Sequence, residues 1–170
     1  MSNLISSNAK FFSMSNGFTT VVYSVLLISG NKLAKTYWEK QTMIWLAEHD
    51  QHFIGNGCAG IDTIKHIEWI KDQFSDQKKF LMQIAQNTID NKVWKVLEYQ
   101  TNEEVVIKFL NKWVEIFESV KIEDIDFSNT YFWYAKSLDT ELENYCEIHS
   151  IRLNKLGKNV KECCFICNDA

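Results

Sequence analysis

Apolar side chains recur at three- and four-residue steps over much of this chain, which is the pattern of helices that bury one face. The clearest example is TNEEVVIKFLNKWVEIFESV, residues 101–120, which opens with Thr101 and Glu104 at the spacing of a capping box. A second is FLMQIAQNTI, residues 80–89. The side chains expected to face the core are Val106, Phe109, Leu110, Trp113, Phe117 and Val120 in the first, and Phe80, Leu81, Ile84, Ala85, Thr88 and Ile89 in the second.

Three further stretches show the same periodicity and are expected to be helical. They are residues 33–52, 61–74 and 137–157. In the second, Asp62 lies where an N-cap would begin the helix, and isoleucine then repeats at every third position. In the third, Gly157 is placed to end the helix.

Strand signals are weaker. Residues 92–99, 131–135 and 163–167 contain β-favouring side chains without clean alternation. The chain has no proline, which suits long helices because proline breaks their interior. At 170 residues and 46% hydrophobic content it can bury one good core. We therefore predict a mainly α, single-domain helical bundle over residues 1–170, which can include a minor β-hairpin.

The longest apolar run near the start is VVYSVLLI, residues 21–28. It is too short to cross a bilayer, and we interpret it as a core segment rather than a signal peptide. The five cysteines are an odd number in a chain too large to need disulfide staples. Reduced thiols in a cytoplasmic protein are the simpler interpretation.

Residues 55–60 read GNGCAG, a complete G-x-G-x-x-G. A dinucleotide fingerprint needs a buried strand before the glycines, and the preceding WLAEHDQHFI is typical of a helix end instead. We interpret the stretch as a corner between two helices, in which Gly55 ends the first helix and Asp62 begins the second. No cofactor is predicted.

Two alternatives stay open at this point. Cys58 with His49 or His52 has the residue types of a cysteine-dependent hydrolase or transferase, since a nucleophilic cysteine needs a nearby base. A C-x2-H-x14-C-x2-C spacing near the end of the chain has the ligand count of a small zinc-stabilised interaction module. Its members are Cys146, His149, Cys164 and Cys167. Neither catalysis nor a metal is our main prediction, because buried or loop cysteines explain both patterns.

Charge is distributed unevenly. The net charge of −4 argues against nucleic acid as a partner bound through its phosphates. Residues 123–147 contain seven Asp or Glu against one lysine, interleaved with aromatic residues. Such a stretch is a solvated face in the simplest interpretation. Acidic groups around tyrosine and tryptophan also suit an interface with a basic protein.

In its length, acidity, aromatic content and residues 123–147, the chain resembles the immunity proteins of bacterial toxin–immunity systems, including those of contact-dependent inhibition. The resemblance implies a small cytoplasmic protein that is not an enzyme. It implies as partner a cognate toxin domain, a basic protein and often a nuclease, whose active site the chain would cover. The residues predicted to bind the toxin are Glu123, Asp124, Asp126, Tyr131, Trp133, Tyr134, Asp139, Glu141 and Glu143.

Overall fold

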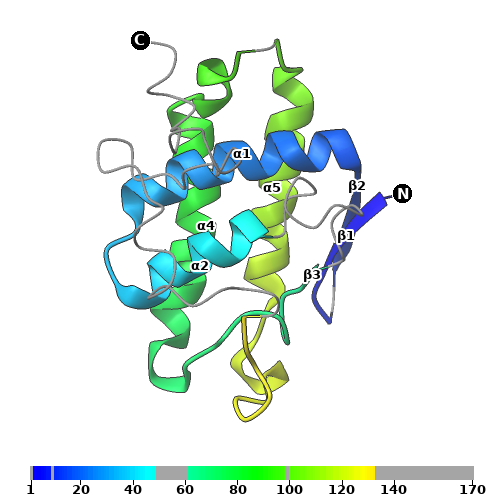
Figure 1. Ribbon diagram of the computed structural model, residues 1–170. Coiled ribbons are helices and arrows are strands. Elements are labelled where there is room, and N and C mark those ends of the chain that lie inside the picture. The colour runs from blue at the N-terminus through cyan, green and yellow to red at the C-terminus, as the bar shows by residue number, and fades with distance from the viewer. Residues whose placement is uncertain (1, 9, 49–60, 99, 133–170) are drawn as a thin grey trace, which may run out of the picture.

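The computed structural model describes residues 2–8, 10–48, 61–98 and 100–132 (Figure 1). These ranges form a mainly α structure with a small three-stranded sheet, so the predicted fold class is confirmed. The elements in chain order are β1 (Ser2–Ser6), β2 (Phe11–Ser15), α1 (Asn16–Leu33), α2 (Tyr37–Glu48), β3 (Ile61–Asp62), α4 (Phe74–Asp90) and α5 (Glu103–Ser119). Short 3₁₀ turns occur at Lys71–Gln73, Val93–Val96 and Ile122–Asp124.

The helices form one packed body around a shared core. Figure 1 shows α4 and α5 side by side, with α1 crossing them and α2 next to α1. Trp113 of α5 is fully buried, and its indole N–H donates to the carbonyl of Leu81 in α4 at 2.8 Å. Between α1 and α2, Gly30 leaves space for Met43, whose sulfur would lie 2.1 Å from a Cβ at that position. The close contact between α1 and α2 therefore depends on the absence of a side chain at Gly30.

The sheet has the order β2-β1-β3. Strands β1 and β2 form an antiparallel hairpin in which Ile5 lies opposite Phe12, and β3 pairs parallel to the end of β1. Along β2, Phe12 and Met14 are buried while Phe11, Ser13 and Ser15 are exposed. This alternation, with a period of two residues, is what places one face of the hairpin on the helical core.

The helix predicted for residues 80–89 is confirmed and begins earlier, at Phe74. The helix predicted for residues 101–120 is also confirmed, although its N-cap is Asn102, whose side chain accepts from the N–H of Val105 at 3.2 Å. Phe109 and Ile89, both expected in the core, are half-buried. Ile116 is buried as well and was not on the predicted face.

The prediction of a helix over residues 61–74 was wrong. Ile61 and Asp62 form strand β3, and the chain then turns before the 3₁₀ turn at Lys71–Gln73. Gly60 is therefore followed by a strand, and the predicted corner between two helices is wrong on that side. The carboxylate of Asp62 caps a turn, because its Oδ1 accepts from the N–H groups of Ile64 at 2.9 Å and Lys65 at 3.4 Å.

Three other predictions need correction. The helix expected to start at residue 33 starts instead with α2 at Tyr37, after α1 has ended at Leu33, and residues 49–52 lie outside the described residues. The strand expected at 92–99 is a 3₁₀ turn that follows Lys92, a residue in the left-handed region at φ 48°. Within 131–135, residues 131 and 132 are not in a strand, and the other three lie outside the described residues.

Candidate functional site

The structure describes the predicted binding region, residues 123–147, as far as residue 132, and residues 121–132 are here called the acidic segment. It follows directly after α5 and includes the 3₁₀ turn Ile122–Asp124. A second turn is closed by the N–H of Asn129, which donates to the carbonyl of Asp126 at 2.9 Å. The segment thus has a defined backbone conformation although it contains no α-helix or strand.

Apolar side chains attach the acidic segment to the core. Ile125 is buried, and Phe127 and Phe132 pack against the core cluster. The ring of Phe132 lies 5.7 Å from the ring of Trp38 and 6.0 Å from that of Trp45, measured between centroids. These contacts place Phe127 and Phe132, two of the aromatic residues in the acidic stretch, half-buried against the core.

Hydrogen bonds join the same segment to the loop between β3 and α4. The N–H of Tyr131 donates to the carbonyl of Lys65 at 3.3 Å, and the hydroxyl of Thr130 donates to the carbonyl of Trp69 at 3.4 Å. Trp69 is itself buried, and its indole N–H donates to the carbonyl of Thr63 at 2.8 Å. The acidic segment is therefore attached at both its α5 end and its far end.

Other side chains of the segment point to solvent. Glu123 and Asp126 are exposed, and Asp124 is half-buried. Tyr131 is 52% exposed and Ile122 is 39% exposed. Two carboxylates and two large apolar groups are thus presented on one ordered stretch of chain.

The environment of Asp126 favours its charged form. The Ser128 hydroxyl donates to its Oδ1 at 2.6 Å, and the Ser128 N–H donates to the same oxygen at 3.1 Å. These two bonds, the hydroxyl first, lower the pKa of the Asp126 carboxyl below the ordinary value of 3.8. Asp126 is a carboxylate at any physiological pH, held in one orientation by its neighbour.

An open groove of about 690 Å³ lies beside the acidic segment, between α4 and α5. Phe74 and Met82 line it from α4, Val114 lines it from α5, and Ile122 of the acidic segment lines its end. Lys78, Lys79 and Glu118 are also part of its wall, so the charge there is mixed. The groove offers apolar contact area next to the exposed carboxylates.

Lys78 has a structural task in this groove. Its ammonium donates to the carbonyls of Glu118 and Val120, each at 2.9 Å. These carbonyls belong to the last turn of α5, where a positive charge is favourable. The lysine therefore stabilises the point at which α5 ends and the acidic segment begins, and its ammonium is hydrogen-bonded within the protein.

Of the residues predicted to bind a partner, the structure describes Glu123, Asp124, Asp126 and Tyr131, all within the acidic segment. The other five lie outside the described residues: Trp133, Tyr134, Asp139, Glu141 and Glu143. Sequence reasoning missed Ile122 and the groove side chains. Ile122 follows the core face of α5 along the chain, and only this spacing could have identified it. The groove side chains could not have been identified, because the groove depends on how two helices pack.

The residues of the two alternative sites also lie outside the described part of the chain. This holds for Cys58 with His49 and His52, and for the proposed zinc ligands Cys146, His149, Cys164 and Cys167. Within the described ranges, no three His, Cys, Asp or Glu side chains are grouped so that they could hold a metal ion. His66 is described, and its Nδ1 accepts from the N–H of Asp62 at 3.2 Å.

No helix among the described residues has the length and apolar character needed to cross a membrane. Comparison of the chain with protein-family models, with curated proteins and with solved structures gave no match.

Proposed function

We propose that this chain is a protein-binding inhibitor of the immunity-protein kind, which neutralises a cognate basic toxin by covering its active site. The observation that supports this most is the division of the acidic segment into a buried side and a presented side. Ile125 and Phe132 attach the segment to the core, while Glu123, Asp126 and Tyr131 face solvent. A segment ordered before binding loses less conformational entropy when a partner docks.

Each presented group has a role in this proposal. The carboxylates of Glu123 and Asp126 take the place of the phosphates that a basic nuclease binds, and they accelerate encounter with a positive surface. Tyr131 supplies an aromatic anchor, the residue type that most often dominates interface energetics. The groove next to Ile122 receives an apolar side chain of the toxin.

The proposed surface continues beyond residue 132 on the strength of the sequence alone. Trp133, Tyr134, Asp139, Glu141 and Glu143 extend the same run of acidic and aromatic residues. We place the protein in the cytoplasm, where such a toxin would act on its target. This part of the proposal rests on the resemblance to immunity proteins.

The test begins with identification of the partner. Tagged protein is used to isolate bound proteins from the source organism, and the isolated partner is then expressed with and without this chain. The proposal expects a basic partner whose toxicity disappears on co-expression. A partner that is acidic, or one whose toxicity is unchanged, contradicts it.

Binding kinetics at two salt concentrations then test the surface. Glu123→Gln should slow association about two- to fivefold at low salt, and the effect should fade as salt screens the charge. Tyr131→Ala should act mainly on dissociation and cost about 2 kcal/mol. Glu104→Gln is the matched control, because Glu104 is exposed at the opposite end of α5. Equal effects of Glu123→Gln and Glu104→Gln would sink the assignment of the surface.

A further inference from the structure

Strand β2 is an edge strand in the described part of the chain, because β1 pairs on one side of it and no described strand pairs on the other. Natural proteins usually protect such edges with lysine, proline or a bulge. The five residues of β2, FFSMS, contain no charge and no proline. Phe11 begins the strand and is 76% exposed.

The hydrogen-bonding phase of the hairpin shows which backbone groups face the open edge. The N–H of Ser7 donates to the carbonyl of Lys10 at 2.8 Å, so this pair is bonded across the hairpin. The next residue, Ser6, bonds in the other direction, since its carbonyl accepts from Thr63 beside β3. Bonded and non-bonded pairs alternate along antiparallel strands. Phe11, opposite Ser6, and Ser13 therefore direct their N–H and C=O groups away from β1.

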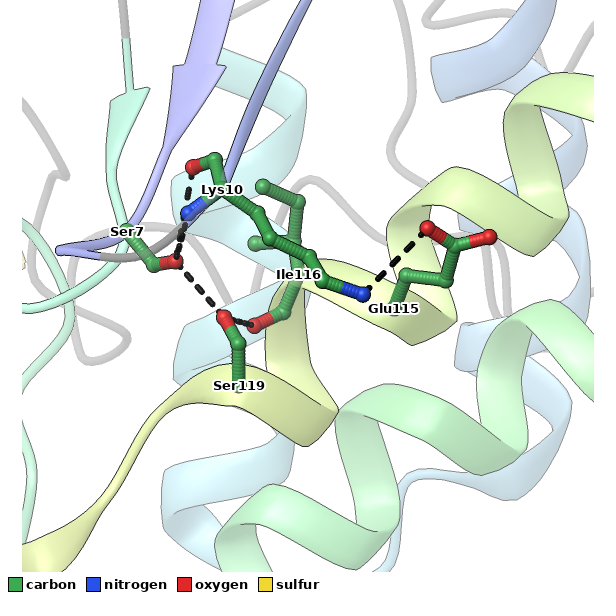
Figure 2. A network of polar contacts seen from close by, with 5 residues as sticks. All are labelled: Ser7, Lys10, Glu115, Ile116 and Ser119. Carbon is green, nitrogen blue, oxygen red and sulfur yellow. Dashed lines mark hydrogen bonds and ion pairs between the residues drawn. The ribbon is translucent and has the colours of Figure 1, made fainter.

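The start of the edge contacts α5. Figure 2 shows Lys10 and Ser7, from the turn before β2, reaching side chains of this helix. The hydroxyls of Ser7 and Ser119 lie 2.7 Å apart, and Lys10 Nζ lies 3.4 Å from a carboxylate oxygen of Glu115. An edge fixed in this way can receive a strand without first becoming ordered.

A groove of about 310 Å³ runs between this edge and α5. Phe11, Phe12 and Ile116 contribute apolar surface, and Lys10, Lys112 and Glu115 contribute charge. The carboxylate of Glu115 forms an ion pair with Lys10. Lys112 lies over the rings of Phe12 and Phe109 at 5.9 and 5.2 Å, and no described carboxylate pairs with it. The groove thus presents one positive charge whose N–H donors remain available.

We infer that the open edge of β2 binds an extended segment of another protein, in which apolar side chains alternate with carboxylates. The segment would add a strand next to Phe11 and Ser13, and its carboxylate would pair with Lys112. A second copy of this chain fits less well, because its own β2 has no carboxylate and would bring a second Lys112 to the same groove.

This surface is independent of the proposed toxin-binding surface. Lys112 and Ile116 lie about half a turn around α5 from Val114 and Glu118, which line the larger groove. Failure of one proposal therefore leaves the other unaffected.

The experiment uses the full chain and a short, end-blocked synthetic peptide that alternates valine with glutamate. Amide hydrogen exchange is measured by nuclear magnetic resonance. In the free protein, the amides of Phe11 and Ser13 should exchange faster than those of Phe12 and Met14. At a peptide concentration ten times Kd, exchange at Phe11 and Ser13 should slow about tenfold. The same peptide with lysine in place of glutamate should bind more weakly.

Two variants separate the proposal from non-specific binding. Ser13→Pro removes an N–H that points away from β1 and bonds to no described residue. The variant should therefore fold but no longer bind the peptide. Lys112→Glu, which changes no residue of β2 although it removes the ammonium that lies over the Phe12 ring, should weaken the glutamate peptide about fivefold and improve binding of the lysine peptide.

Three outcomes would overturn the inference. They are no slowing of exchange up to the peptide's solubility limit, unchanged peptide binding by both folded variants, or a dimer in analytical ultracentrifugation that Ser13→Pro dissociates. The last result would assign the edge to a second copy.

Discussion

Residues 61–73 place isoleucine at every third position and helix α5 places apolar side chains at three- and four-residue steps, yet the two regions have different backbones. In the first region Ile61, Ile64 and Ile67 are buried along a strand end and a turn. In the second, Val106, Leu110, Trp113 and Phe117 are buried along a regular helix. Both regions thus bury their apolar residues at the spacing of a helix face, and this spacing alone does not distinguish a helix from a folded loop.

Local chemistry accounts for the difference. In the loop, the side chain of Asp62 binds the backbone of its own turn. Ile61 and Asp62 also pair with Ile5 and Ser6 of β1, contacts that no local pattern reveals. Helix α5 instead starts with a capping Asn102 and two acidic residues in its first turn, and straight-chain residues occupy its outer face.

The largest expected effect comes from the buried tryptophan of each region. Trp113→Ala and Trp69→Ala should each cost about 3–5 kcal/mol, because both rings are buried and both indole N–H groups are bonded. Urea unfolding measures the loss. Tyr37→Ala, at a residue 58% exposed, is the control and should change stability by about 0.5 kcal/mol or less. A cost near that of the control for Trp69→Ala would mean that the loop is not part of the cooperative core.

A second change tests packing against helix propensity. Gly30→Ala favours the helical backbone of α1 by up to about 1 kcal/mol. Its Cβ would nevertheless lie 2.1 Å from Met43 Sδ and 3.3 Å from Ile84 Cδ1. We expect a net loss of about 1–2 kcal/mol in the free energy of unfolding.

The control lies in the same helix. Gly17 has no atom within 4 Å of a Cβ, so Gly17→Ala should be neutral or stabilise by up to about 1 kcal/mol. In a Met43→Ala background the cost of Gly30→Ala should shrink, since the clashing sulfur is gone. Stabilisation by Gly30→Ala in the natural background would show that propensity outweighs packing here.

A third change addresses the turn that distinguishes the loop. Asp62→Ala removes the acceptor for the N–H groups of Ile64 and Lys65 and should cost about 1 kcal/mol. Asp62→Asn keeps a side-chain oxygen and should cost less. Glu68→Ala is the control, because Glu68 is exposed in the same loop. Equal thermal shifts for Asp62→Ala and Glu68→Ala would show that the cap is not stabilising.

The fold class and most of the core face of α4 and α5 could be predicted from the sequence because amphipathic periodicity is a local signal. A minor β-hairpin was predicted, but its position at β1 and β2 was missed, although Phe12 and Met14 alternate with exposed residues, because serine occupies many positions in both strands. At the candidate site, the acidic composition was visible in the sequence. The sequence did not reveal that Phe132 packs against the core while Tyr131 is exposed, since this depends on Trp38 and Trp45, which are distant in the chain.

The smallest expected effect concerns Asp126, an exposed carboxyl outside both compared regions. Its titration tests whether local side-chain hydrogen bonds also order the acidic segment. Its pKa is lowered below 3.8 by the hydroxyl and N–H of Ser128. A lowered folded-state pKa means that the bonds stabilise the folded protein above the unfolded pKa, and that this contribution is lost as pH falls through the folded value. Ser128→Ala removes the larger cause, so the pKa of Asp126 should rise toward 3.8, whereas Ser128→Thr, which keeps a hydroxyl, should leave it low. Carboxyl ¹³C titration measures both. An Asp126 pKa that is the same in Ser128→Ala as in the natural protein would mean that the hydroxyl does not orient this carboxylate, and the segment would lose one of the contacts that fix its presented side.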